Sequence, residues 1–423
     1  MEEQMESIEE KAKYCLHCKI KPCSNKGCPL KNNIPDFIEN IVKKDYETAY
    51  KILSQTTVLP GVCGRICPHK KQCEGSCVRG IKQVPVEIGN LEAFVFDKVV
   101  KDENALLHIW KDETEKNIKN KKVAVIGGGP AGLTAAAFLR RYGLNVTIYE
   151  KYGYLGGLLV HGIPEFRLDK SVVELTVKNI LNLGIKVEYN KELGKNLFIE
   201  ELKTQYDAIF LSFGANCSSK MGVEGENLQG VYGGNELLEY NIHPEYEGKT
   251  AVIIGGGNVA MDCARTVKKL GAKEVKVIYR RAKEQMPAEE KEIECAEHEG
   301  IEFLFQNNIV KIIGEKQVEK IELIKTKLLA KDGETRLIPV NIEGSNYCIE
   351  TDYVIMALGS NTDEMVKNLG LELDKWGSIK INSNYQTSDK KVFAGGDVAG
   401  VKSTVAWAAF SGREAAKKII ENI

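Results

Sequence analysis

Three stretches of the chain place apolar and polar residues in patterns that predict regular elements. In residues 34–55, IPDFIENIVKKDYETAYKILSQ, apolar side chains recur at helical spacing, which predicts helices whose apolar positions form a core. Residues 123–151, VAVIGGGPAGLTAAAFLRRYGLNVTIYEK, form an apolar strand, a glycine-rich turn, an amphipathic helix and a second strand. The same order recurs in residues 250–284, TAVIIGGGNVAMDCARTVKKLGAKEVKVIYRRAKE. The pattern predicts a helical region followed by two βαβ units.

Composition narrows the class of protein. The chain has 423 residues, 43% of them apolar, and a formal net charge of -1, which favours several globular domains and excludes a nucleic-acid coat. Its first residues, MEEQMESIEEKAKYC, are acidic and polar, unlike a signal peptide, and no apolar run reaches the roughly 18–20 residues of a membrane helix. We therefore expect a cytoplasmic protein with reduced thiols that binds neither nucleic acid nor membrane.

The first glycine-rich turn has the spacing G-x-G-x-x-G between a strand and a helix. Gly127 allows the tight turn, Gly129 lets the backbone approach a pyrophosphate, and Gly132 lets the helix pack against the strand. Glu150 ends the second strand, where a carboxylate can bind a ribose hydroxyl. This setting predicts a dinucleotide site, and the acidic residue suits FAD.

The second glycine-rich turn ends differently. Gly255 and Gly257 open it, and Ala260 stands in the place of the third glycine, a permitted substitution. The following strand ends in Arg280 and Arg281 instead of an acid, which favours the additional phosphate of NADP(H), with NAD(H) as the alternative. As a rival interpretation, the two arginines are ordinary surface residues. Two dinucleotides in one chain imply hydride transfer between cofactors, so we expect no catalytic side chain.

Eight of the twelve cysteines lie in two groups near the N-terminus. The first group is CLHCKIKPCSNKGCP, residues 15–29, and the second is CGRICPHKKQCEGSC, residues 63–77. Both contain a Cys-Pro step, which is frequent in iron–sulfur ligand runs. Zinc is the rival, but its usual paired C-x2-C spacing occurs only at Cys15 and Cys18. A thioredoxin-reductase type of enzyme would need a C-x-x-C in a nucleotide domain, and none of the four remaining cysteines has such a neighbour.

The predicted fold class is α/β, with a helical N-terminal iron–sulfur domain and two Rossmann-like nucleotide-binding domains, the second inserted in the first. We expect the helical domain at 1–120, the FAD-binding domain at 121–229 and 353–423, and the NAD(P)H-binding domain at 230–352.

The order of cysteine region, flavin loop, nicotinamide loop and VFAGGDVAGVKSTVAWAAFSGREAAKKI, residues 392–419, resembles the glutamate synthase small (β) subunit family. That family includes the N-terminal half of dihydropyrimidine dehydrogenase, its short bacterial NAD-dependent subunit, and the large subunit of NADH-dependent ferredoxin–NADP oxidoreductase. The resemblance covers nearly the whole chain. It implies an electron-input subunit that passes electrons from NADPH through FAD and two [4Fe–4S] clusters to a partner.

The resemblance also implies ligands for each group. One cluster would be held by Cys15, Cys18, Cys23 and Glu92, and the other by Cys28, Cys67, Cys73 and Cys77. The FAD residues would be Gly127, Gly129, Pro130, Ala131, Gly132, Glu150, Gly157, Leu158, Arg167, Leu193, Gly396, Asp397, Thr404 and Val405. The NAD(P) residues would be Gly255, Gly256, Gly257, Asn258, Val259, Ala260, Arg280, Arg281, Ala357, Leu358 and Gly359. Cys63 is left over as a buried thiol.

The resemblance implies a hetero-oligomer, because the chain has no room for an FMN-bearing barrel. The expected partner is the glutamate synthase large subunit. The alternatives are an FMN-barrel pyrimidine reductase, supported by the segments GVCGRICP, EIGNLEAF and NYQTSDKKVFAGGD, and a ferredoxin-linked subunit of a bifurcating complex. A scaffold without cofactors is the non-enzymatic alternative, and the intact loop at Gly127–Gly132 argues against it.

Overall fold

A computed structural model describes residues 7–114, 120–330, 337–401 and 404–423 of the chain. It forms two compact units, the first made of residues 1–160, 165–215 and 364–423, the second of residues 161–164 and 216–363. The boundaries expected at 229/230 and 352/353 fall inside the second unit. The reason is that strand β5 (Cys217–Ser218) pairs with β15 (Ser360–Asn361) outside those limits.

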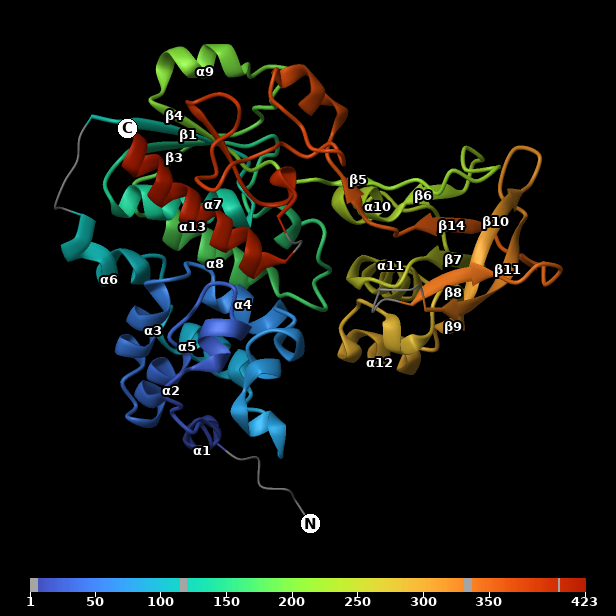
Figure 1. Cartoon of the computed structure of the whole chain (residues 1–423), viewed down its shortest axis with the longest axis horizontal. Coiled ribbons are helices and arrows are strands. Elements are labelled where there is room, and N and C mark those ends of the chain that lie inside the picture. The colour runs from blue at the N-terminus through green and yellow to red at the C-terminus, as the bar shows by residue number, and fades with distance from the viewer. Residues whose placement is uncertain (1–6, 115–119, 331–336, 402–403) are drawn as a thin grey trace. The chain divides into compact units, whose positions relative to one another are not determined.

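The N-terminal part of the first unit is helical, as expected, and is drawn in blue in Figure 1. Its apolar positions Phe37, Ile38 and Ile41 are fully buried, so the helical spacing in the sequence correctly marks the core. No helix among the described residues is both long and apolar enough to cross a membrane. The helices are α1 (Ile8–Lys13), α2 (Ile34–Val42), α3 (Tyr46–Ser54), α4 (Pro60–Ile66), α5 (Ile88–Val99) and α6 (Ala105–Thr114).

The rest of the first unit is a parallel five-stranded sheet with strand order β16-β4-β1-β2-β3. Strand β16 comes from the C-terminal part of the chain and pairs with β4, so the second unit is inserted in the first, which confirms the predicted fold class. The strands are β1 (Lys122–Ile126), β2 (Asn145–Tyr149), β3 (Lys186–Glu188), β4 (Ala208–Leu211) and β16 (Val392–Ala394). The helices are α7 (Pro130–Arg141), α8 (Lys170–Leu181), α9 (Ile199–Gln205) and α13 (Val405–Asn422).

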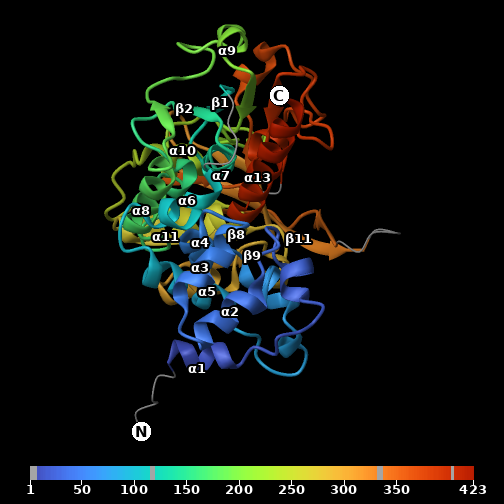
Figure 2. The same ribbon diagram turned by 90° about the vertical axis from the view of Figure 1, so that its left-hand side faces the viewer.

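Helix α13 lies along α7, as both ribbon views show (Figures 1 and 2). The two helices approach so closely that a Cβ at Gly412 would overlap the carbonyl oxygen of Ala131. The C-terminal helix is therefore packed directly on the helix that follows the first glycine-rich turn.

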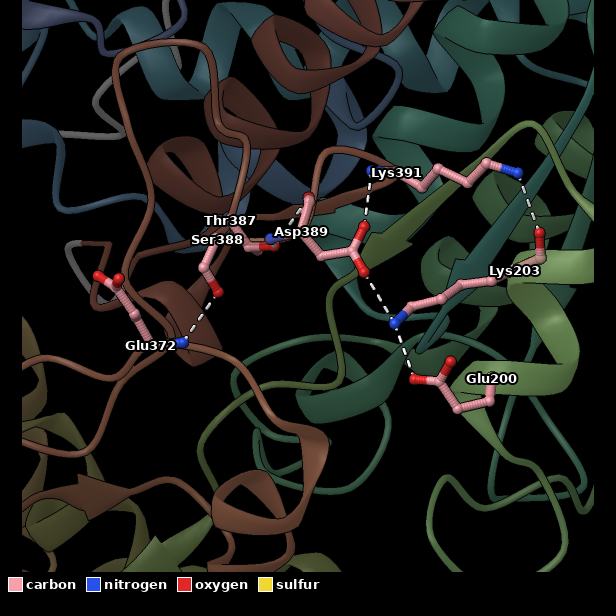
Figure 3. A network of polar contacts seen from close by, with 7 residues as sticks. All are labelled: Glu200, Lys203, Glu372, Thr387, Ser388, Asp389 and Lys391. Atoms are coloured by element: carbon pink, nitrogen blue, oxygen red, sulfur yellow. Dashed lines mark hydrogen bonds and ion pairs between the residues drawn. The ribbon is translucent and has the colours of Figure 1, made fainter.

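A polar network fixes the segment that returns the chain to the first sheet (Figure 3). Lys203 on α9 forms ion pairs with Asp389, at 2.8 Å, and with Glu200, also at 2.8 Å. Asp389 in turn accepts a hydrogen bond from the backbone N–H of Lys391 at 2.9 Å, directly before β16 begins. These contacts set the register of β16 and so the position of the residues that follow it.

The second unit contains another parallel five-stranded sheet, with order β6-β14-β7-β8-β9. Between β9 and β14 in the chain lies an antiparallel group, in which β11 pairs with β10, β12 and β13. The strands are β6 (Val231–Gly233), β7 (Thr250–Ile254), β8 (Glu274–Tyr279), β9 (Glu302–Phe305), β10 (Asn307–Ile313), β11 (Lys320–Leu329), β12 (Ile338–Asn341), β13 (Tyr347–Glu350) and β14 (Tyr353–Met356). The helices are α10 (Gly234–Tyr240), α11 (Asn258–Lys269) and α12 (Glu290–His298).

Candidate functional site

The first glycine-rich turn connects β1 to α7 and has the geometry of a phosphate-binding loop. Gly127 has a φ of +100°, which glycine adopts without strain. A Cβ at Gly132 would overlap the Gly127 carbonyl oxygen, so this glycine permits the close packing of helix and turn. By contrast, a Cβ at Gly129 would meet no atom within 4 Å, so the turn faces open space there. The open space and the N-terminus of α7 together fit a pyrophosphate group.

We predict that Gly129→Ala removes flavin binding without unfolding the protein. The added methyl group meets no protein atom, and Gly129 has an ordinary φ of -77°, so stability should change by no more than about 0.5 kcal/mol. The methyl group would nevertheless occupy the space in front of the turn. Thermal unfolding and the flavin-to-protein absorbance ratio check this. Gly132→Ala is the matched control and should destabilise the fold by roughly 1–3 kcal/mol, because its methyl group has no room.

Glu150 follows β2 and is 5% exposed. Its carboxylate accepts hydrogen bonds from the backbone N–H groups of Gly128, at 2.7 Å, and Tyr152, at 3.0 Å. Burial raises the pKa of this carboxyl, against the effect of the two amide donors. The carboxylate thus holds the glycine-rich turn, and its remaining lone pairs can still accept a hydrogen bond from a ribose hydroxyl.

Asp397 provides the sharpest test of whether the first unit fits FAD. It lies in a short turn after β16, beside Gly396, whose N–H donates to Ser411 Oγ at 2.8 Å. Among the described residues, no hydrogen-bond donor reaches the buried Asp397 Oδ1. Burial raises the pKa of this carboxyl to about 6. A buried oxygen without a donor is costly, so a ligand hydroxyl at this point fits the site.

The other residues expected at the flavin come from several segments of the first unit. Gly157 approaches the backbone of Gly129, since a Cβ there would stand 3.0 Å from the Gly129 Cα. Thr404 caps the N-terminus of α13, where Val405 is the first helical residue. Pro130 and Ala131 begin α7, while Leu158 and Arg167 are half-buried in the segment after β2. Leu193 instead packs in the core of the first unit, where it is 5% exposed.

The second glycine-rich turn repeats the first between β7 and α11. Gly255 has a φ of +145° and packs against Ala357, which follows β14. Gly257 precedes α11, and the nearest atom to a Cβ there is 3.9 Å away. Ala260 is fully buried, so a methyl group fits where the first turn needs Gly132. This turn also fits a pyrophosphate group.

Five other residues expected at the nicotinamide nucleotide lie in this turn, at the start of α11 or in the loop after β14. Gly256 packs against the ring of Tyr279, and the Asn258 side chain accepts a hydrogen bond from the Glu289 N–H at 2.9 Å. Leu358 is exposed after β14, and Gly359 accepts a hydrogen bond from Ser219. Val259 packs partly buried against the core of the second unit.

Arg280 and Arg281 follow β8, as expected, and their backbone is held firmly. The Arg280 carbonyl accepts a hydrogen bond from Thr326 Oγ1 at 2.8 Å, and the Arg281 carbonyl accepts one from the Gln306 N–H at 3.0 Å. The buried Nε of Arg281 has no acceptor among the described residues. A guanidinium with an unused donor, on a backbone that is held in place, fits a phosphate group.

In the helical part of the first unit, cysteines from both groups line one hollow. This hollow offers about 350 Å³ of space, part of it open to solvent. Its cysteines are Cys15, Cys18, Cys23 and Cys77, and apolar side chains such as Ile34 and Val86 line the rest. Burial raises the pKa of the Cys23 thiol to about 11, with smaller contributions from Cys15 and Cys77. Ionised cysteines gathered in this way would suit a positively charged partner such as iron.

A second collection of side chains lies around Glu92, which is 5% exposed. Burial raises the pKa of Glu92 to about 8, and Asn32 Nδ2 donates to its carboxylate at 3.2 Å. Burial also raises the pKa of Cys28 to about 12, followed by the effects of Glu92 and Cys63. The neighbours that raise the pKa of Cys73, after burial, are Cys28 and Glu92. The group is completed by Cys67, whose thiol pKa is raised chiefly by a hydrogen bond with Cys63.

The structure thus groups two residues differently from the expectation. Cys77 lies with Cys15, Cys18 and Cys23, and Glu92 lies with Cys28, Cys67 and Cys73. Arg79 explains the position of Cys77, because its guanidinium stacks 4.2 Å over the Tyr14 ring and its Nε donates to the Tyr14 carbonyl at 3.0 Å. The hydrogen bond from Asn32 likewise keeps Glu92 beside the segment that follows Cys28.

Within the described residues, no three His, Cys, Asp or Glu side chains are placed to hold a single metal ion. A structural zinc site would bring four ligand atoms within about 2.0–2.3 Å of one point. In a [4Fe–4S] cluster each protein ligand binds a different iron, so the ligands stand further apart. A donor set made almost entirely of cysteines is compatible with such a cluster.

Arg413 on α13 connects the flavin part of the first unit to the cysteine part. Its Nη1 donates to the carbonyls of Leu30, at 2.8 Å, and Thr56, at 2.9 Å. Thr56 Oγ1 donates to Asn32 Oδ1 at 2.6 Å, and Asn32 contacts Glu92. Sequence reasoning missed this residue, since a lone arginine in a C-terminal helix carries no motif.

Two family profiles match the chain. Residues 121–415 match the family described as pyridine nucleotide-disulphide oxidoreductase. Residues 1–104 match the family described as dihydropyrimidine dehydrogenase domain II, 4Fe-4S cluster. Together they show FAD- and NAD(P)-binding domains and a 4Fe-4S domain.

Individual proteins agree with the profiles. The glutamate synthase [NADPH] small chain of Halomonas elongata is 35% identical over 97% of this chain and 89% of its own length. The beta subunit of the NADP(+)-dependent formate dehydrogenase of Moorella thermoacetica is 37% identical over 94% of this chain, which spans 59% of that protein. The structure of Mycobacterium tuberculosis FprA in complex with NADPH matches 72% of this chain and 85% of its own, with a TM-score of 0.64 and 19% identity, and so shows the fold.

Proposed function

Because this chain belongs to the glutamate synthase small-chain family and is an NAD(P)H-dependent oxidoreductase, we propose that it oxidises NADPH and delivers the electrons to a partner chain. NADPH would become NADP⁺ with release of one proton, and two electrons would leave one at a time. When bound, FAD would accept the hydride, and [4Fe–4S] clusters would carry its electrons singly. The observation that carries this proposal is the presence of two phosphate-binding turns and two cysteine groups in one chain.

The two turns divide the nucleotides between them. The turn at Gly129, with Asp397 accepting a ligand hydroxyl, would hold FAD. The turn at Gly257, with Arg281 donating to a 2′-phosphate, would hold NADPH. Among the described residues, the buried Asp397 Oδ1 has no hydrogen-bond donor and the buried Arg281 Nε has no acceptor. Both observations support this division.

We propose two [4Fe–4S] clusters, with ligands grouped as the side chains lie in the structure. One cluster would be bound by Cys15, Cys18, Cys23 and Cys77. The other would be bound by Cys28, Cys67, Cys73 and Glu92. Cys63 is 2% exposed and lies against Cys67, so it would protect the second cluster from solvent.

The proposed partner is a glutamate synthase large chain, in a hetero-oligomer located in the cytoplasm. The names of the relatives, a small chain and a beta subunit, support a hetero-oligomer. None of the twelve cysteines forms a disulfide, and a reducing compartment would keep them available as cluster ligands.

Reconstitution with a glutamate synthase large chain tests the partner. The mixture should form glutamate from glutamine and 2-oxoglutarate with NADPH, and neither chain alone should do so. If no glutamate forms while the chain still reduces a one-electron dye with NADPH, the partner is wrong and the electron-input function stands. If the dye is not reduced either, the proposed function itself fails.

A pyrimidine reductase is the second candidate partner. The match of residues 1–104 to a dihydropyrimidine dehydrogenase domain favours it. NADPH-dependent reduction of uracil by a mixture with an FMN-barrel chain, without glutamate formation in the first assay, would support this candidate.

A further inference from the structure

Exposed apolar side chains lie on the two chain segments that line the hollow with Cys15, Cys18, Cys23 and Cys77. Ile20 is 78% exposed, Ile81 76% and Val84 72%, and they are three of the five most exposed large apolar side chains among the described residues. Leu16, which lines the hollow itself, is also exposed. Apolar groups gathered in this way on a surface mark an interaction site.

Two segments of the chain are held together at this place. The Tyr14 hydroxyl donates to the Val84 carbonyl at 3.1 Å and to Gln83 Oε1 at 3.0 Å. The stacking of Arg79 on Tyr14 adds a second connection between the same segments. These contacts and the shared hollow hold the two segments that carry the apolar residues together, although more than sixty positions separate them in the sequence.

The charge of this surface differs from that of the whole chain. Residues 15–28 contain three lysines and no acidic residue, and residues 77–86 contain Arg79 and Lys82 and no acidic residue, in a chain of net charge -1. Lys19, Lys26 and Lys82 are exposed and form no ion pair within the part of the chain that the structure describes. Lys21 differs, because it pairs with Asp36 at 2.8 Å. We call Leu16, Ile20, Ile81, Val84, Lys19, Lys26 and Lys82 the basic–apolar surface.

We propose that the basic–apolar surface binds the acidic face of the electron-accepting protein. This inference rests on the proposed function. An apolar centre with a charged rim is the usual anatomy of a protein interface, and opposite charge speeds and orients the encounter. A second copy of this chain would oppose lysine with lysine, which disfavours self-association. Electron transfer slows steeply with distance, so an acceptor gains most by binding where the cysteines come nearest to solvent.

Binding to an acidic plant-type ferredoxin, measured by calorimetry with both proteins oxidised and the iron–sulfur sites loaded, tests the proposal. The wild-type protein should bind, and affinity should fall as salt is raised. Ile20→Ser/Ile81→Ser and Lys19→Glu/Lys82→Glu should each raise the Kd at least about tenfold. Ile242→Ser/Lys316→Glu, which changes an equally exposed isoleucine and an exposed lysine of the second unit, should leave the Kd within about twofold.

Failure of this inference can be separated from failure of the proposed function. NADPH-driven reduction of benzoquinone, a small neutral acceptor, should be unchanged in all variants. If benzoquinone is reduced but the wild-type protein binds neither ferredoxin nor the proposed large chain, or the variants bind as well as the wild-type protein does, the basic–apolar surface is not an acceptor site. Loss of binding to phosphatidylserine vesicles in the same variants, with no ferredoxin binding, would identify the surface as a membrane contact and overturn the proposal. If benzoquinone is not reduced by the wild-type protein, the electron-input function fails first.

Discussion

Replacement of Cys77 by serine is expected to remove one whole cluster, about half of the bound iron, and to leave the other intact. The reason is that Cys77 lines the hollow together with Cys15, Cys18 and Cys23 and lies apart from the group around Glu92. Iron and sulfide content, with the electron paramagnetic resonance spectrum of the dithionite-reduced protein, measure the effect. Cys15→Ser should remove the same signal as Cys77→Ser.

Two further variants complete this experiment. Glu92→Ala should alter the signal that Cys77→Ser leaves in place, because Glu92 lies beside Cys28 and Cys73. Cys63→Ser is the matched control, since it removes a buried thiol of the same group that is not assigned as a ligand, and it should retain the iron of both clusters. The grouping would be refuted if Cys77→Ser and Cys67→Ser removed the same signal while Cys15→Ser removed the other.

Substitution of Arg281 by alanine is expected to raise the KM for NADPH about 10- to 100-fold and to change the KM for NADH little. Hydrogen bonds to charged groups contribute about 1.5–3 kcal/mol, and only NADPH offers the extra phosphate. The buried Nε of Arg281, which has no acceptor among the described residues, and the hydrogen-bonded carbonyls of Arg280 and Arg281 support such a contact. Steady-state kinetics with both nucleotides and a one-electron dye measure the two constants.

Lys283 supplies the control for Arg281. It is a nearby cation, but it forms an ion pair with Glu297, so Lys283→Ala should affect both nucleotides equally and weakly. Equal increases in the two constants for Arg281→Ala would show that the residue does not read the phosphate.

The nucleotide-binding folds were predictable because local pattern determines them. The order of strand, glycine-rich turn and helix identified both turns, and the structure has β1–α7 and β7–α11 at these positions. The need for glycine at Gly127 and Gly132 is equally local, since it arises from a positive φ and a close approach within a few residues. The predicted insertion of one unit in the other is confirmed by the pairing of β16 with β4.

The grouping of the cysteines was harder to predict because it depends on contacts between distant residues. The stacking of Arg79 on Tyr14 and the hydrogen bond from Asn32 to Glu92 cannot be inferred from spacing. One signal was present, however. In two-cluster ferredoxins the fourth cysteine of a run binds the other cluster. Applied to both runs, this rule assigns Cys28 to the cluster of the second run and Cys77 to the cluster of the first run. The side chains are grouped in the same way in the structure.

Leu193 and Glu150 show a second limit of prediction from the sequence. Sequence could place both near the flavin loop, but whether a side chain faces a ligand or its own protein depends on packing. Leu193 joins an apolar core, and the Glu150 carboxylate supports the backbone of the turn.

Anaerobic addition of NADPH to the purified protein, with iron, sulfide and flavin quantified, tests the central claim most directly. We expect about eight irons, about eight sulfides and about one FAD per chain, with NADPH bleaching the absorbance of both flavin and iron–sulfur centres. Zinc in place of iron, or bleaching confined to the flavin, would contradict the claim that this chain carries electrons from NADPH through clusters to a partner.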